Sequence, residues 1–247
     1  MNTDIQSIIK DRFDKVFTQL KGTKIYPEES KLRISQPLLN GKGQYIFDIK
    51  NATVDGMVEQ HLDRNDVFVP NKWGVLISIK EKATGVEQLY SFAPKNDGTN
   101  PSIFPVGFSN NQVESIYSGF LSWLVDNQVM LSTYPMEKFR KVPRQQGAFV
   151  LDSQDAAVQE GVQPEWTLDK ALELIIPRYT IAGTRDHKIT VNFPAAGLTF
   201  PLADKDGATT DYEADLVLYL DGFLIKGGCE YKGGNGSNPF GDAVGQW

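Results

Sequence analysis

The sequence predicts an all-β protein, a sandwich or a jelly roll, with one amphipathic helix at its N-terminus. After residue 22, apolar and polar residues alternate with a period of two, which is typical of strands that bury one face. Pairs of turn-forming residues separate some of these runs, and long loops rich in Pro, Gly and Asn connect the others. Strands connected in this way favour a sandwich or jelly roll over a fold of alternating strands and helices.

The first segment, 3–21, has the boundary residues and the periodicity of a helix. Thr3 is a candidate N-cap with Gln6 three residues later, and Gly22 is a candidate stop. The opposite face, which includes Arg12, carries charges that nearly cancel, so we expect little attraction to anionic lipid. The helix either packs on its own domain or lies on a partner or lipid surface. Its apolar stripe consists of Ile5, Ile8, Ile9, Phe13, Val16, Phe17 and Leu20.

The rest of the chain contains nine runs with the pattern of strands. The turn pair Asp126-Asn127 separates two of them, and the pair Asp221-Gly222 predicts a second tight hairpin. Short helical turns are expected at 110–117 and 167–174. The expected strands are 44–50, 73–80, 87–92, 119–125, 128–134, 174–182, 187–193, 214–220 and 222–227.

Composition and charge exclude several classes of protein. The 247 residues carry a formal net charge of -6, which argues against a dedicated nucleic-acid binder. A single cysteine, Cys229, excludes an internal disulfide framework and a thiolate metal cage within one chain. The N-terminal residues lack the pattern of a secretory signal, and no apolar run is long enough to span a bilayer. We therefore expect synthesis in a reducing cytoplasm, without export or membrane insertion.

The residues that could carry chemistry do not form a recognisable motif. The two histidines, His61 and His187, have no partner at metal-ligand spacing, and we expect both at the surface or at a loop edge. Acidic pairs such as Asp63 with Asp66 could act in a glycosidase, but solvated surface is much the commoner explanation. No nucleophile elbow and no phosphate-binding loop is present. The sequence thus predicts no catalytic residue, no metal site and no cofactor.

Two oppositely charged segments are candidates for contacts between subunits. A basic run at 138–144 contains Pro143, and an acidic segment covers 204–215. They are either solvated loops, the basic one guarding an exposed edge, or complementary faces that meet between copies of the chain. The C-terminal Trp247 could also dock on a neighbour. The charged candidates are Lys138, Arg140, Lys141 and Arg144 on the basic side and Asp204, Asp206, Asp211, Glu213 and Asp215 on the acidic side.

Three stretches together resemble a known family. The segments "IYSGFLSWLVDNQVMLSTYPMEKFRKVPRQQ" (116–146), "HLDRNDVFVPNKWGVLISI" (61–79) and "ELIIPRYTIAGTRDHKITVNFP" (173–194) are similar to major capsid proteins of tailless, membrane-containing icosahedral bacteriophages. The resemblance implies a double jelly roll, in which two eight-stranded barrels stand side by side. It also implies trimers of pseudo-hexagonal outline that tile an icosahedral shell over an internal membrane, with the N-terminal helix pointing inward.

The resemblance divides the chain into a helix at 1–22, a first jelly roll at 23–150 and a second jelly roll with a glycine-rich arm at 151–247. The polar segment 144–166 would form the boundary. Size departs from this pattern, since we count about ten strands where two barrels need about sixteen. A single jelly roll with long insertions is the alternative.

The function expected from this resemblance is structural. The chain would be a virion protein without enzymatic activity that binds itself, penton or minor capsid proteins and the internal membrane, without sequence-specific binding of nucleic acid. The alternative is a carbohydrate-binding β-sandwich, with Trp73, Trp123, Trp166 and Tyr134 as sugar platforms. Trp73 and Trp123 lie in strand-like runs, which favours burial in the core for both.

Overall fold

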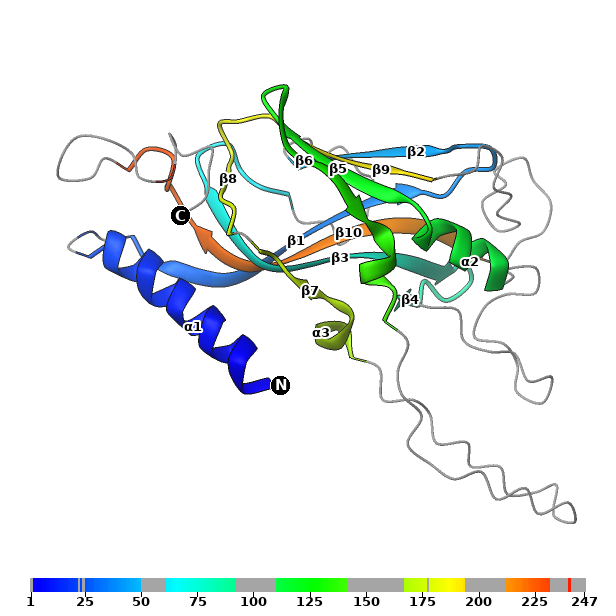
Figure 1. The fold of residues 1–247 in the computed structure, drawn as a ribbon, viewed down its shortest axis with the longest axis horizontal. Coiled ribbons are helices and arrows are strands. Elements are labelled where there is room, and N and C mark those ends of the chain that lie inside the picture. The colour runs from blue at the N-terminus through cyan, green and yellow to red at the C-terminus, as the bar shows by residue number, and fades with distance from the viewer. Residues whose placement is uncertain are drawn as a thin grey trace, which may run out of the picture.

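The computed structural model describes residues 2–21, 23, 25–49, 61–91, 110–141, 167–176, 178–193, 212–231 and 240. Its strands form two antiparallel sheets that face each other as a sandwich, and helix α1 (Asn2–Gln19) lies outside it (Figure 1). The prediction of a mainly β protein with an N-terminal helix is confirmed. The helix begins at Asn2, so the expected cap Thr3 lies within it.

Sheet A has the order β1-β10-β3-β4, and two short strands, β7 and β8, also pair with β3. Its strands are β1 (Pro27–Pro37), β3 (Val67–Glu81), β4 (Glu87–Tyr90), β7 (Glu173–Leu174), β8 (Ile181–Ala182) and β10 (Tyr212–Ile225). Sheet B has the order β2-β9-β5-β6, with β2 (Gln44–Asp48), β5 (Phe120–Val125), β6 (Gln128–Pro135) and β9 (His187–Asn192). The other helices are α2 (Asn110–Tyr117), η1 (Met136–Phe139) and α3 (Leu168–Ala171).

The strand pairs are nested along the chain. β1 pairs with β10, β2 with β9, β3 with β7 and β8, and β5 with β6. The chain therefore runs like one long hairpin. Its successive strand pairs lie alternately in sheet A and sheet B. Each sheet takes strands from both sides of segment 144–166, so the described strands are not divided into one barrel before it and another after it.

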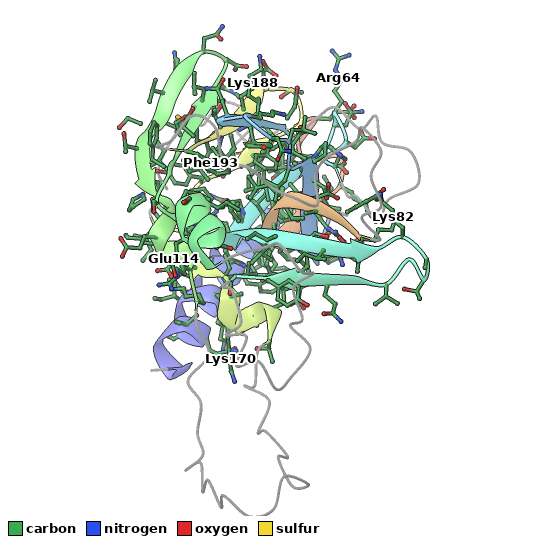
Figure 2. The ribbon with its side chains drawn as sticks, turned by 90° about the vertical axis from the view of Figure 1, so that its right-hand side faces the viewer. Arg64, Lys82, Glu114, Lys170, Lys188 and Phe193 are labelled. Atoms are coloured by element: carbon green, nitrogen blue, oxygen red, sulfur yellow. The ribbon has the colours of Figure 1, made fainter. Side chains whose placement is uncertain are left out.

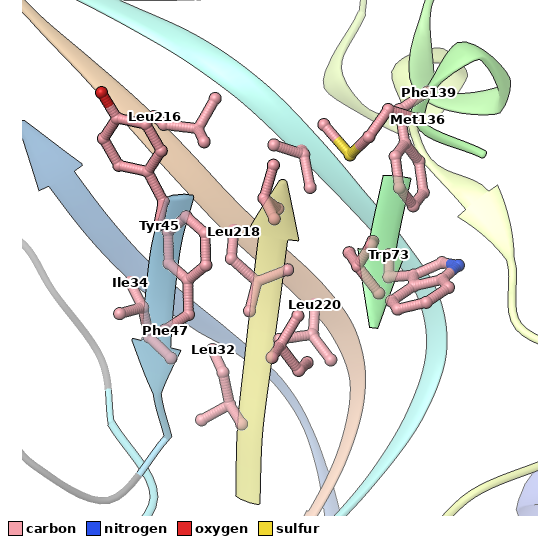
Figure 3. Packing of buried hydrophobic residues seen from close by; sticks show 14 of the residues in the cluster. Leu32, Ile34, Tyr45, Phe47, Trp73, Met136, Phe139, Leu216, Leu218 and Leu220 are labelled. Atoms are coloured by element: carbon pink, nitrogen blue, oxygen red, sulfur yellow. The ribbon is translucent and has the colours of Figure 1, made fainter. Parts of the chain in front are cut away.

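The main core lies between the two sheets. Leu216, Leu218 and Leu220 of β10 point into it from sheet A, and Tyr45 and Phe47 of β2 point into it from sheet B (Figure 3). Alternation along these strands puts every second side chain inside, where apolar burial contributes roughly 25 cal/mol per Å². The core is closed at one end by Met136 and Phe139 of η1, both 0% exposed.

The outer face of sheet A is also covered. Side chains of α1 form one apolar cluster with the β8 end of β3, and α3 with the residue after it forms another with the middle of β3 and β10. Val217 and Tyr219 belong to this outer cluster, whereas their neighbours Leu216 and Leu218 face the inner core. Sheet A is therefore the middle layer of the molecule (Figure 1).

The two expected turns have different outcomes. Asp126 and Asn127 have φ of 47° and 66°, as a tight hairpin between β5 and β6 requires, so this turn is confirmed. The hairpin at Asp221-Gly222 is wrong, because β10 continues through both residues. A methyl group at Gly222 would lie 2.2 Å from the carbonyl oxygen of Val69. The glycine is needed here for close approach of two backbones at a β-bulge, not for a turn.

The expected strand at 174–182 is also only partly right. Its ends are β7 and β8, and the described residues between them are not strand. The sequence has Pro177 in the middle of this run, and proline has no N–H for a strand ladder. Ile175 instead donates its N–H to the carbonyl of Asn71 at 2.9 Å.

Candidate functional site

The C-terminal half of α1 packs on its own domain. Val16 and Leu20 are 0% and 2% exposed and lie in a cluster with Val67 and Val69 of β3. Phe13 meets Phe223 of β10 edge to face, with ring centroids 5.2 Å apart. This part of the expected apolar stripe therefore faces sheet A rather than a partner.

The rest of the stripe is less covered. Ile8 and Phe17 are 38% and 44% exposed, and Ile5 and Ile9 are half-buried. Phe17 stacks on Phe13 at 6.1 Å, which leaves one side of its ring open. The flanks of the stripe and its N-terminal end thus keep apolar surface available for another molecule.

Arg12 is buried, which corrects the expectation that it lies on the polar face of the helix. It is 7% exposed, and its guanidinium donates to the carbonyls of Asn71 at 3.3 Å and Ile175 at 2.5 Å. At the β-bulge between β3 and β10, Asn71 is the extra residue of β3 and has no partner in β10. Its backbone carbonyl is therefore free to accept hydrogen bonds from Arg12 and from the N–H of Ile175. The sequence position of Arg12 could have indicated its burial, because Arg12 lies one helical turn before Val16 and so on the same side of the helix.

A second arginine, Arg178, is buried beside the first. It is 7% exposed and follows Ile175 on the segment between β7 and β8. Burial, together with the positive charge of Arg12, lowers the pKa of Arg178, and Asp11 opposes this effect. Burial also lowers the pKa of Arg12. The sequence did not predict the buried position of Arg178, because an isolated arginine in a strand-like run belongs to no motif.

The basic candidates are largely engaged within the chain. Arg140 forms an ion pair with Glu114, a residue of α2 at the surface (Figure 2), and Lys141 forms one with Glu173 at 2.5 Å. The ammonium group of Lys138 lies 4.9 Å from the ring centre of Tyr134. Arg144 lies outside the described residues. The cluster is therefore partly neutralised by its own chain before any neighbour is considered.

The acidic candidates are only partly described. Glu213 is exposed at the start of β10. Asp215 is 7% exposed and lies opposite Ser78 within sheet A, so it is corrected from a subunit contact to a residue buried in its own sheet. Asp204, Asp206, Asp211 and Trp247 lie outside the described residues, and the charge-complementarity hypothesis stays a prediction for them.

The aromatic residues considered as sugar platforms belong to the core. Trp73 and Trp123 are 2% and 1% exposed, with ring centroids 6.3 Å apart. Tyr134 is half-buried with its ring centroid 5.0 Å from that of Trp73, and Trp166 lies outside the described residues. The expectation of buried Trp73 and Trp123 is confirmed, so neither ring can stack on a sugar.

Both histidines differ from simple surface residues. His187 is 2% exposed, and its ring centroid lies 6.0 Å from that of Trp123, so the expectation of a surface position is wrong for it. His187 begins β9, where its side chain points into the sandwich next to apolar strand residues. His61 is half-buried.

The acidic pair Asp63 and Asp66 holds a loop together. Asp63 accepts a hydrogen bond from the N–H of Asn65 at 3.2 Å, and Asp66 accepts one from the N–H of Gly227 at 2.8 Å. Both carboxylates therefore bind backbone groups, as turn residues commonly do. Across the described part of the chain, no three His, Cys, Asp or Glu side chains are grouped so as to hold a metal ion.

Comparison with protein-family models, curated proteins and solved structures found no match. Within the described residues, every helix is too short or too polar to cross a membrane.

Proposed function

We propose that this chain is a structural subunit of a virus shell, built on a single jelly roll with long insertions. The observation that carries the proposal is the nested pairing of β1 with β10, β2 with β9, β3 with β7 and β8, and β5 with β6. A jelly roll has eight strand positions in two Greek keys. The described strands fill these positions once, with β7 and β8 sharing one of them and β4 as an addition beside β3.

The pairing of the strands supports a single jelly roll over a double one. In a double jelly roll, strands from each half of the chain pair mainly among themselves. In this chain, β1 at residues 27–37 runs beside β10 at residues 212–225 over its whole length. Viral capsid proteins are among the main users of jelly rolls, which gives the sequence resemblance a matching scaffold.

The proposed subunit forms trimers, and the trimers form an icosahedral shell around an internal membrane, together with penton or minor capsid proteins. Such a role needs a rigid body that exposes contact surface, and no reactive group. The closely packed aromatic core is consistent with the rigid body. Ile8 and Phe17 on α1 provide exposed apolar surface for an inward-facing neighbour or the membrane.

Lectins also use jelly rolls, so a carbohydrate-binding module remains the second candidate. It loses two of its four proposed platforms, because Trp73 and Trp123 are buried. Binding of the purified chain to a glycan array, without self-association, would favour this candidate.

The proposal is tested by measuring the molar mass of the purified protein with light scattering over a range of concentration and salt. We expect a trimer or larger species that increases with concentration. A monomer under every condition would contradict the proposed shell role, whatever the state of its fold.

Charge reversal tests whether the basic run takes part in assembly. Arg140→Glu with Lys141→Glu should lower the proportion of trimer at low salt, where charged contacts are least screened. Loss of the pairs with Glu114 and Glu173 should reduce the free energy of unfolding by only about 1 kcal/mol each, so the fold should survive. Lys226→Glu, which breaks an exposed pair with Glu28 elsewhere, is the control. Equal assembly by all three proteins would exclude the basic run from the interface.

A further inference from the structure

Three elements meet behind α1: the helix itself, the bulge at Asn71 on β3, and the segment that follows β7. Arg12 connects them by donating to the carbonyls of Asn71 at 3.3 Å and Ile175 at 2.5 Å. These bonds use neutral carbonyl acceptors, so the positive charge of Arg12 is solvated but not neutralised. The junction therefore holds one buried cation before Arg178 is considered.

Arg178 adds a second buried cation, and two of its three guanidinium nitrogens have no hydrogen-bond acceptor among the described residues. Its Nε and Nη2 atoms are buried, and among the described residues neither has an acceptor. Among the described residues, the negative charge of Asp11 acts to raise the pKa of both arginines. Asp11 forms an ion pair with Lys15 at 2.8 Å, and its side chain is 62% exposed, so it is held at the surface rather than between the guanidinium groups.

A buried guanidinium with unpaired N–H groups is strongly unfavourable, and two like charges side by side add to the cost. An oxyanion offers several acceptor atoms and a negative charge, and it can bind a guanidinium through two parallel hydrogen bonds. We propose that the junction behind α1 is a binding site for a carboxylate or phosphate oxyanion, held by Arg178 and facing Arg12.

The orphan N–H groups have no accessible surface, so an oxyanion reaches them only when α1 or the segment around Arg178 shifts. The apolar contact of α1 with sheet A is small, since Val16 is the one fully buried apolar residue among those described in the helix and Leu20 directly follows it. Ile176, next to the site in sequence, is 72% exposed, and Ile8 lies one helical turn before Arg12. Binding at this site would thus be coupled to the position of the helix.

The oxyanion has two sources of the same chemistry: a free anion, or an acidic side chain of a second copy of this chain. Thermal unfolding of the full chain in sodium phosphate and in sodium chloride, at equal ionic strength, tests for the site itself. We expect phosphate to raise the unfolding midpoint by about 5 °C for the wild type. Light scattering on the same samples distinguishes the sources. A monomer stabilised by phosphate indicates a free anion, and dissociation of oligomers by phosphate indicates an acidic group of a neighbour.

Arg178→Met is the decisive variant because it keeps an unbranched apolar stem and removes the charge and its donors. We expect it to unfold at a higher temperature than the wild type in chloride, and to lose the response to phosphate. Arg64→Met, at an exposed position on the periphery of the molecule (Figure 2), is the matched control and should keep the full response.

Equal shifts for the wild type and Arg178→Met, or no shift for either, would overturn the site. If Arg178→Met does not fold, Arg178→Lys and calorimetric titration of the wild type with phosphate replace it. Absence of saturable heat in the wild type then overturns the proposal, and heat that saturates near one phosphate per chain and is lost in the lysine variant supports it. The oxyanion site does not depend on the proposed shell role. A permanent monomer that binds phosphate through Arg178 would support the site and contradict the shell role.

Discussion

The two sheets of this protein bury their residues differently. Sheet A is covered by sheet B on one face and by α1 and α3 on the other, and residues 214–220 of β10 are all buried. Among the described residues, sheet B is covered on one face only, and its strand β2 alternates between exposed and buried residues. Ile46 and Phe120 are 48% and 40% exposed on its open face.

The difference in coverage explains the sequence pattern of β10 in sheet A. A strand that is buried on both faces has a near-continuous apolar sequence, whereas a strand with one solvated face alternates. The run "ADLVLYL" of sheet A shows the first pattern. In the run "QYIFD" of sheet B burial alternates, although the exposed residue Ile46 is apolar. Polar groups enclosed on the outer face of sheet A, including Arg12 and Arg178, are consequently the places where burial has the largest cost.

The largest expected effect comes from removing the same side chain on opposite faces of sheet B. Phe47→Ala should reduce the free energy of unfolding by about 3–5 kcal/mol, because Phe47 is 0% exposed in the inner core. Phe120→Ala on the open face should cost less than about 1 kcal/mol. Denaturant unfolding measures both, and equal losses would contradict the one-sided burial of sheet B.

Next in size is the close approach of β10 to β3 within sheet A. Gly222→Ala should cost about 3 kcal/mol, since the new methyl group would lie 2.2 Å from the Val69 carbonyl oxygen and 2.8 Å from Cα of Pro70. Gly43→Ala has no atom within 4 Å of the added methyl group and is the matched control. Wild-type stability of both variants in denaturant unfolding would contradict the close approach of β10 to β3 at this glycine.

A smaller effect tests the outer face of sheet A directly. Val217→Ala should cost about 1.5 kcal/mol, because Val217 is 0% exposed although it points away from the core between the sheets. Val129→Ala in sheet B, at a position that is 62% exposed, should change stability by less than about 0.5 kcal/mol. If urea midpoints show the same small change for both, α3 does not cover sheet A in solution.

The smallest effect concerns pH. Burial by itself raises the pKa of Glu87, but hydrogen bonds from Arg33 and Ser78 and the nearby positive charges outweigh it, so the pKa is lowered. A lowered folded-state pKa stabilises the fold above the unfolded-state pKa of about 4.3, and this contribution is lost as pH falls through the folded-state value. The free energy of unfolding of Glu87→Gln should therefore fall less steeply than that of the wild type as the pH is lowered into the acid range.

The control for this pH effect is Glu28→Gln, whose ion pair with Lys226 is exposed. Unfolding measured between neutral and acid pH should give nearly the wild-type curve for the control. An unchanged acid slope in Glu87→Gln would show that the bonds from Arg33 and Ser78 do not form in solution.

Sequence reasoning identified those elements whose signal is local. The turn at Asp126-Asn127 and the helix at 110–117 depend on neighbouring residues only, and both are present. Strand β1 was missed, because its first half carries Glu28, Glu29 and Lys31 and its strand character comes from pairing with β10. Asp221-Gly222 misled for the same reason, since contacts with β1 and β3 override the local turn preference there.

The junction behind α1 was beyond sequence reasoning. Its two arginines are 166 residues apart in the chain and meet only because β3 carries a bulge and α1 folds back on it. Periodicity assigned Arg12 to solvent, since a charged residue within an amphipathic helix is normally exposed. The candidate subunit contacts were equally hard to judge, because the acids that engage Arg140 and Lys141 come from distant segments.

In the proposed assembly, one chain contributes one jelly roll to a closed shell. Electron cryo-microscopy of the assembly formed by the purified protein tests it most directly. We expect trimeric units in tiles or shells, with a single sandwich per chain in which residues 27–37 run beside residues 212–225. Particles with two separate barrels per chain, or isolated chains at every concentration and salt, would contradict it.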